Sequence, residues 1–101
     1  MTSFGYYVAA ARQEKGWRQS YLAVLLEISG SYVNDIEKGR RYPPGEYLLQ
    51  RFASALELDP DYLCLLAGII PHDVRAAIGA TDPEAVQRAF RAFREALAPL
   101  R

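Results

Sequence analysis

Apolar residues recur at helical spacing in short segments along this chain, and glycine, proline, serine or aspartate separates one segment from the next. No low-complexity tract or internal repeat interrupts this pattern. Helices are predicted over residues 4–15, 18–26, 30–38, 45–58, 60–68, 71–78 and 83–98. The pattern therefore predicts an all-α protein.

Cap and stop residues define the ends of the predicted helices. Ser29 is suited to accept a hydrogen bond from an amide one turn into the third helix, and Gly39 is suited to end that helix. Asp59-Pro60 and Asp82-Pro83 each place a capping carboxylate before a proline at the first helical position. The second and third helices are short and closely connected, so we expect them to form a helix-turn-helix.

The third predicted helix has a polar outer side. Val33 and Ile36 occupy its apolar face. The other side carries Gly30, Ser31, Asn34, Asp35 and Lys38. Arg40 and Arg41 follow directly after Gly39. The sequence thus predicts a small polar helix face beside a local basic cluster.

A set of short motifs links the first two thirds of the chain to a known family. Arg12 lies in the first helix, "WRQSYLA" leads the second, "IS" lies at the turn, "YVNDIEKG" covers the third helix and "RRYPP" follows it. With these motifs, residues 4–68 resemble the Cro and phage-repressor type of helix-turn-helix domain, often called the xenobiotic-response-element (XRE) family. The resemblance implies a five-helix, lambda-repressor-like DNA-binding domain over residues 1–68, followed by a C-terminal helical extension over residues 69–101.

The resemblance also implies that the third helix enters the major groove, where base edges present distinct patterns of donors and acceptors. The candidates for base contacts are Gly30, Ser31, Asn34 and Asp35. Asn34 is the best single candidate, because its amide can pair with adenine, whereas Asp35 could accept from cytosine but would otherwise be repelled by phosphates. Gly30 offers only backbone, so the protein either approaches the groove closely there or gives up a contact.

Phosphate contacts are expected from the flanks of the same helix. The candidates are Gln19, Tyr32, Lys38, Arg40 and Arg41. The role of Gln19 comes from the resemblance, in which the amino end of the second helix contacts a phosphate. Lys38, Arg40 and Arg41 would supply positive charge where a duplex backbone passes. Tyr32 has two interpretations, because its ring could cover the edge of the core or its hydroxyl could reach DNA.

Four further positions can be compared with the family pattern. Arg12 and Glu37 match a pair that forms a buried ion pair between the first and third helices, so we expect both to be structural. Arg18 stands where a small capping residue is usual, and Glu27 stands where the turn often has glycine. A left-handed backbone costs a non-glycine residue about 1 to 2 kcal/mol, so a turn of different shape is one possible consequence.

Composition limits the classes of function. The 101 residues include twelve basic and twelve acidic ones, so the formal net charge is zero and any DNA binding must depend on the local cluster. Cys64 and His72 are the single cysteine and histidine, and no catalytic, cofactor-binding or metal-binding constellation is evident. We therefore expect neither an enzyme nor a cofactor. No secretion signal or membrane-spanning stretch is present, which predicts a cytoplasmic protein.

The last predicted helix carries an apolar stripe. Its members are Val86, Ala89, Phe90, Phe93 and Leu97. This stripe could pack on the chain's own five-helix unit or on the same stripe of a second copy. Because regulators of this fold usually bind paired half-sites as two-fold dimers, we expect a dimer interface here.

The predicted function is sequence-specific, DNA-binding regulation of transcription by a dimeric repressor of a palindromic operator. Repression rests on the family resemblance alone. An alternative is an antitoxin-like or partner-binding regulator whose last helix docks another protein. A third interpretation is a helical adaptor that has lost DNA binding, which the zero net charge, Gly30 and Asp35 would favour. The expected partners are double-stranded DNA and a second copy of the chain, with a protein partner possible and no membrane.

Overall fold

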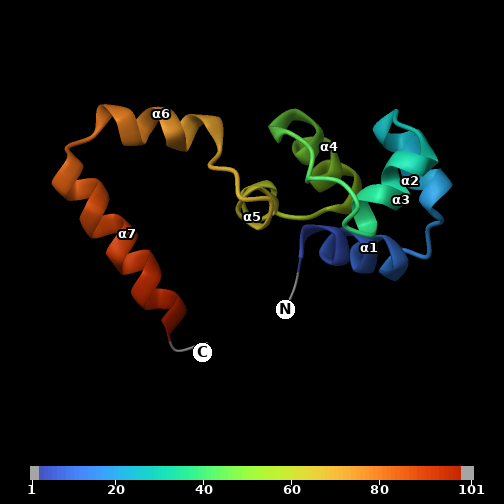
Figure 1. Cartoon of the computed structure of the whole chain (residues 1–101), viewed down its shortest axis with the longest axis horizontal. Coiled ribbons are helices and arrows are strands. Elements are labelled where there is room, and N and C mark those ends of the chain that lie inside the picture. The colour runs from blue at the N-terminus through green and yellow to red at the C-terminus, as the bar shows by residue number, and fades with distance from the viewer. Residues whose placement is uncertain (1–2, 99–101) are drawn as a thin grey trace. The chain divides into compact units, whose positions relative to one another are not determined.

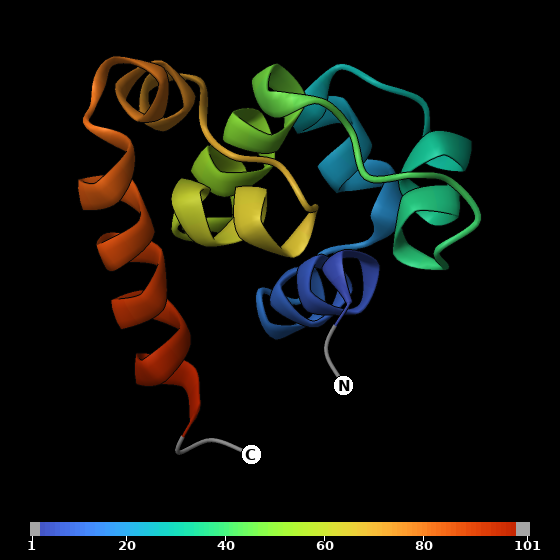
Figure 2. The same ribbon diagram turned by 60° about the vertical axis from the view of Figure 1, so that its left-hand side comes forward.

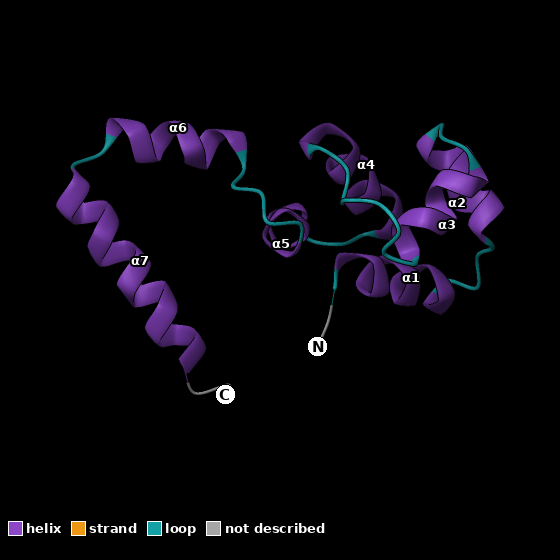
Figure 3. Cartoon of the chain, in the orientation of Figure 1, coloured by secondary structure: helices purple, strands orange, loops and turns teal. Residues whose placement is uncertain are grey.

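The computed structural model describes residues 3–98, and its ribbon consists of helices joined by loops (Figure 1). The helices are α1 (Phe4–Glu14), α2 (Gln19–Leu26), α3 (Gly30–Glu37), α4 (Glu46–Leu56), α5 (Pro60–Leu66), α6 (His72–Ala80) and α7 (Pro83–Leu97). No strand occurs among the described residues (Figure 3), so the predicted all-α fold is confirmed. Residues 1–2 and 99–101, which the two predicted domains include, lie outside the described part of the chain.

A few helix ends differ from the predicted ones. The fourth helix, predicted over residues 45–58, begins after Gly45, which takes an extended cap conformation. It ends at Leu56 because Glu57 adopts the left-handed conformation, with φ of 57°. Lys38 is the C-cap of α3 and therefore lies at the exit of that helix. Such differences are within the usual spread of helix ends.

The chain divides into two units between Pro71 and His72. The first unit contains α1 to α5, which gather around one another in both views (Figures 1 and 2). The second unit contains α6 and α7, and neither helix has a buried residue. Asp82 caps α7 by accepting a hydrogen bond from the amide of Ala85 at 3.2 Å.

The hydrophobic core lies in the first unit, and every one of its five helices contributes to it. Its largest fully buried members are Val8, Leu22, Leu26, Val33, Leu49, Phe52 and Leu63. Phe4 of α1 meets Phe52 of α4 edge to face, with ring centroids 5.8 Å apart. Full burial of such side chains stabilises the fold by about 1.5 to 3 kcal/mol each. The inward face of α3, formed by Val33 and Ile36, is part of this core, which leaves its polar face outside.

The turn between α2 and α3 keeps the left-handed conformation without a glycine. Glu27 has φ of 58° and caps the end of α2, and the amide of Ile28 donates to the carbonyl of Ala23 at 3.0 Å. The exposed carboxylate of Glu27 accepts a hydrogen bond from Arg51 of α4 at 2.5 Å, which raises the pKa of Arg51. Glu27 thus adopts the left-handed conformation without being glycine, and its side chain adds a link to α4. Arg18, at the N-cap of α2, makes no side-chain cap.

Close contact between α1 and the end of α3 depends on Gly5. A Cβ atom at Gly5 would lie 2.3 Å from the carbonyl oxygen of Ile36 and 2.8 Å from that of Glu37. Both contacts involve backbone, which cannot move away as a flexible side chain can. We expect Gly5→Ala to lower the stability of the protein by about 1 to 3 kcal/mol. Thermal unfolding followed by circular dichroism would measure this loss.

Gly30→Ala provides the matched control for this prediction. A Cβ atom at Gly30 would meet nothing within 4 Å, and the residue is not in the left-handed region. We therefore expect Gly30→Ala to melt close to the wild-type temperature. Equal melting temperatures for both variants would contradict the proposed role of Gly5 in seating α1 against α3.

Candidate nucleic-acid interface

The outward face of α3 is short and polar. The helix begins at a defined point, because Ser29 caps it by accepting a hydrogen bond from the amide of Tyr32 at 3.0 Å. Gly30 and Ser31 are exposed, whereas Asn34 and Asp35 are partly buried. All four predicted base-contacting residues thus lie on the part of α3 that does not face the core.

A buried ion pair ties the far end of α3 to α1. Arg12 donates from Nε to Oε2 of Glu37 at 2.7 Å and from Nη2 to Oε1 at 3.0 Å. Only 11% of the Arg12 side chain and 4% of the Glu37 side chain are exposed. Arg12 Nη1 also donates to the carbonyl of Trp17 at 2.6 Å, which fixes the loop before α2. The two side chains thus join α1, this loop and α3.

Gln19 extends this network to the polar face of α3. Its Nε2 donates to Glu37 Oε1 at 2.9 Å and to Asn34 Oδ1 at 3.2 Å. The amide nitrogen of Gln19 is therefore turned toward α3, and its two hydrogens are both engaged. Contact with a phosphate remains a prediction for Gln19. The backbone amide at this first position of α2 is a suitable donor for it, because N-terminal amides of helices bind phosphate.

Two basic residues that follow α3, Arg40 and Arg41, lie near the carboxylate of Asp35. Arg40 Nη1 lies 3.8 Å from Asp35 Oδ1, and Arg41 Nε lies 3.5 Å from Asp35 Oδ2. Both arginine side chains are about three-fifths exposed, and exposed pairs of this kind are weak, so either can exchange Asp35 for a phosphate. The structure therefore brings a predicted base contact together with two predicted phosphate contacts.

Tyr32 lies between the core and this basic cluster. Its ring is partly buried and packs against the core, while the guanidinium carbon of Arg41 lies 5.1 Å from the ring centroid. The Tyr32 ring therefore covers the edge of the core, as the first of the two interpretations predicted. A contact between its hydroxyl and DNA remains a prediction.

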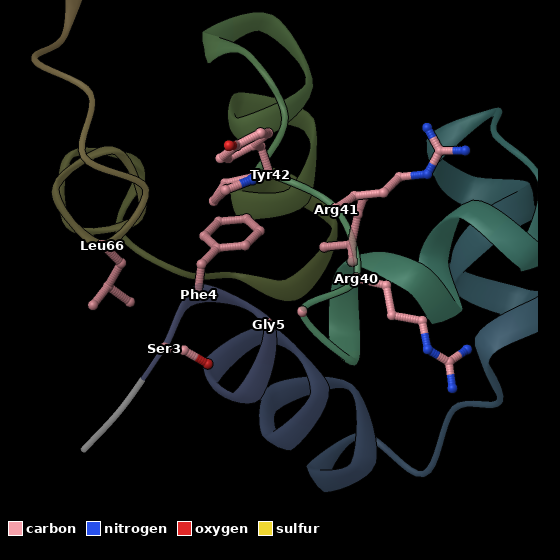
Figure 4. Close-up of a pocket in the computed structure, with 10 residues that line it drawn as sticks. Ser3, Phe4, Gly5, Arg40, Arg41, Tyr42 and Leu66 are labelled. Carbon is pink, nitrogen blue, oxygen red and sulfur yellow. The ribbon is translucent and has the colours of Figure 1, made fainter.

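A hollow of about 560 Å³ opens between the start of α1 and the loop after α3 (Figure 4). Phe4, Tyr42 and Leu66 are among the residues that line it. The guanidinium groups of Arg40 and Arg41 point away from Phe4 and Tyr42 in this view. Arg40 and Arg41 also line the hollow, with their charged ends turned away from these two aromatic rings.

Comparison with known proteins assigns the family. The family model described as helix-turn-helix matches residues 8–63, which begin in α1 and end in α5. The chain belongs to this helix-turn-helix family, of the Cro and phage-repressor type. A curated relative, the HTH-type transcriptional repressor RghR of Bacillus subtilis, is 32% identical over 78 residues. The alignment covers 75% of this chain and 58% of RghR, so the chain spans less than two thirds of that relative's length.

Two solved structures share the fold of this helix-turn-helix protein. The P22 c2 repressor, in complex with a synthetic operator, aligns with a TM-score of 0.57 and 27% identity. That alignment covers 62% of this chain and 94% of the repressor. The restriction-modification controller protein C.AhdI of Aeromonas hydrophila aligns with a TM-score of 0.54 and 33% identity, covering 59% of this chain and 86% of C.AhdI.

Metal ligands, the single cysteine and membrane-spanning helices were the other features considered in the sequence of the helix-turn-helix protein. Among residues 3–98, no group of three His, Cys, Asp or Glu side chains is placed to hold a metal ion. Cys64 is buried, and this burial raises the pKa of its thiol. Within the same part of the chain, none of the helices has the length and apolar character needed to cross a membrane.

Proposed function

We propose that this helix-turn-helix protein binds double-stranded DNA sequence-specifically through the outward face of α3 and thereby represses transcription. The observation that carries the proposal is the composition of that face. Ser31 and Asn34 lie on a helix that a buried ion pair anchors, and Lys38, Arg40 and Arg41 follow at its end. Major grooves admit a helix of this size, and the P22 c2 repressor, which shares the fold, is described with an operator.

The residues of this face have separate tasks in the proposal. Ser31 and Asn34 contact base edges, and Asp35 accepts from a cytosine when Arg40 and Arg41 leave it for phosphates. Lys38 contacts the DNA backbone together with these two arginines. Tyr32 and the backbone amide of Gln19 add neutral contacts. Because the whole chain carries no net charge, the affinity depends on this local cluster. Each phosphate that the protein neutralises makes the slope of log K against log salt concentration more negative by about 0.9.

We further propose that α7 joins two copies of the protein. Phe90, Phe93 and Leu97 of its apolar stripe remain about half exposed in the single chain, and Ala89 and Val86 complete the stripe. Phe90 and Phe93 pack edge to face with centroids 6.2 Å apart, forming one continuous aromatic ridge. A two-fold dimer would place two copies of α3 on half-sites about 34 Å apart.

Selection of bound sequences from a random DNA pool tests this function. We expect the wild-type protein to enrich an inverted repeat with half-sites about one helical turn apart. Failure to enrich any motif at low salt would contradict specific DNA binding and would favour the adaptor interpretation. Enrichment of a single asymmetric half-site would contradict the dimer and leave the role of α3 standing.

Asn34→Ala is expected to relax the preference at one position of each half-site. Loss of an amide that pairs with a base should cost about 1 to 3 kcal/mol against the selected base and little against the others. Fluorescence anisotropy with duplexes that differ only at that position would measure the change. Gln50→Ala, which removes an exposed amide on α4, is the control and should bind like the wild type. Equal weakening on all sequences would show that Asn34 does not read a base.

A further inference from the structure

We propose that Gln19 is a positioning residue that fixes which end of the Asn34 amide faces DNA. This inference rests on the proposed function, because it concerns how α3 reads a base. It departs from the phosphate contact expected for the Gln19 side chain. The assignment follows from the directions of the hydrogen bonds that run from the buried ion pair to the surface of α3.

The direction of these bonds is set by Glu37. A carboxylate accepts hydrogen bonds, and Glu37 Oε1 already accepts from Arg12 Nη2 at 3.0 Å. The amide group of Gln19 lies 2.9 Å from the same oxygen, so it must present its nitrogen rather than its oxygen there. Because 96% of the Glu37 side chain is buried, water does not offer an easy alternative partner. The buried carboxylate of Glu37 therefore fixes the orientation of the Gln19 amide.

The fixed nitrogen of Gln19 then orients Asn34. The second hydrogen on Gln19 Nε2 points to Asn34 Oδ1 at 3.2 Å, so the Asn34 oxygen faces α2. Its Nδ2 has no partner among the described residues, and Asn34 is partly exposed. The Asn34 amide thus presents a donor to the outside. Side chains held in this way by a second layer of hydrogen bonds make more selective contacts than freely rotating ones.

A donor on α3 selects bases that show acceptors in the major groove. Guanine offers N7 and O6 there, whereas adenine offers N7 next to a donor. With its oxygen engaged by Gln19, Asn34 should favour guanine over the two-bond pairing with adenine. A bare asparagine that rotates freely has no such bias, so the expected base differs between the two cases.

The test compares Gln19→Ala and Asn34→Ala on the sequence selected by the wild-type protein. We expect guanine at the position that Asn34 reads, and we expect Gln19→Ala to lower the discrimination at that same position about fivefold. In the Asn34→Ala background, Gln19→Ala should produce no further loss at this position. Gln13→Ala, an exposed glutamine on α1, is the matched control and should leave the preference unchanged.

Other outcomes separate this inference from the proposed function. If the wild-type protein enriches no motif, the proposed function itself fails, before any variant is compared. If Gln19→Ala weakens binding equally on all sequences, the side chain contacts a phosphate and the positioning role is overturned. An unchanged preference in Gln19→Ala would overturn it as well. Arg12 still pairs with Glu37 in this variant, so we expect it to fold, which its melting curve would verify.

A change from amide to carboxylate at Asn34 gives a second, opposite prediction. In Asn34→Asp the hydrogen bond from Gln19 can persist, but the group that faces DNA becomes an acceptor. We expect the preference to change from guanine to cytosine, whose N4 is a donor in the major groove. Retention of the wild-type preference would contradict the outward-donor arrangement.

Discussion

A Glu37→Ala variant is expected to lose much of the stability of the fold. The substitution leaves Arg12 buried without its carboxylate partner, and this stranded charge should cost about 3 to 5 kcal/mol. For a domain of this size, each kcal/mol corresponds to about 4 to 8 °C in melting temperature. Thermal unfolding monitored by far-ultraviolet circular dichroism would therefore show a transition shifted well below that of the wild-type protein.

Glu57→Ala is the matched control for Glu37→Ala. Glu57 pairs with Lys15, but 79% of its side chain is exposed, and a hydrogen bond from Lys15 holds the pKa of Glu57 below its usual value. Exposed pairs contribute little, because water and salt screen them. We expect this variant to melt close to the wild-type temperature. A Glu37→Ala protein with the same melting temperature as the control would contradict the structural role of the pair.

Removal of both phenylalanines from the stripe on α7 is expected to reduce operator affinity strongly. If α7 joins two copies, Phe90→Ala with Phe93→Ala should yield a monomer that binds each half-site independently. Loss of the link between two binding modules lowers apparent affinity by about 100-fold to 10,000-fold. Light scattering would report the change of mass, and fluorescence anisotropy on the selected duplex would report the affinity. The hydrophobic core lies between Phe4 and Cys64 in the first unit, so the main unfolding transition should persist.

A control for this prediction lies on the opposite side of the same helix. Arg88→Ala with Glu95→Ala also replaces two long side chains by alanine and leaves the net charge unchanged. We expect this variant to remain dimeric. A wild-type protein that is monomeric at tens of micromolar would contradict dimerisation through α7. A wild-type dimer whose apolar stripe on α7 still binds an apolar fluorescent dye would instead favour the partner-binding alternative.

The fold was predictable because its signals are local. Ser29 and Asp59 accept hydrogen bonds from the amides of Tyr32 and Tyr62, three residues ahead in each case. Such caps depend only on neighbouring residues, so they can be read along the chain. The apolar spacing of α3 likewise placed Val33 and Ile36 in the core, and the family resemblance supplied the rest of the architecture.

Contacts between helices were much harder to predict. The bond between Gln19 and Asn34 joins residues 15 apart, and the pairing of Glu27 with Arg51 joins residues 24 apart. The spacing of residues within one helix gives no information about partners on another helix. Both contacts depend on how α2 packs against its neighbours. The close approach at Gly5 was missed for the same reason, because a glycine inside a predicted helix gives no sign of the backbone that faces it.

The sequence indicated that Arg40 and Arg41 form a basic cluster, but it did not indicate that they pair with Asp35. Charge and position after α3 marked Arg40 and Arg41 as candidate phosphate contacts, and the structure shows that their side chains are exposed. Their pairing with Asp35 across the end of α3 follows from the left-handed turn at Gly39, with φ of 72°, which folds the chain back toward the helix. Helical spacing ends at that turn, so it could not indicate the pairing.

Nuclear magnetic resonance of the backbone amides, recorded as the selected duplex is added, tests most directly whether α3 reads DNA. We expect the largest chemical shift changes between residues 29 and 41 and at the start of α2. Changes in α4 should be smaller, and a scrambled duplex should produce changes at the basic residues but not at Ser31 or Asn34. Perturbations centred on α6 and α7, with residues 29–41 unaffected by the selected duplex, would contradict DNA recognition by α3.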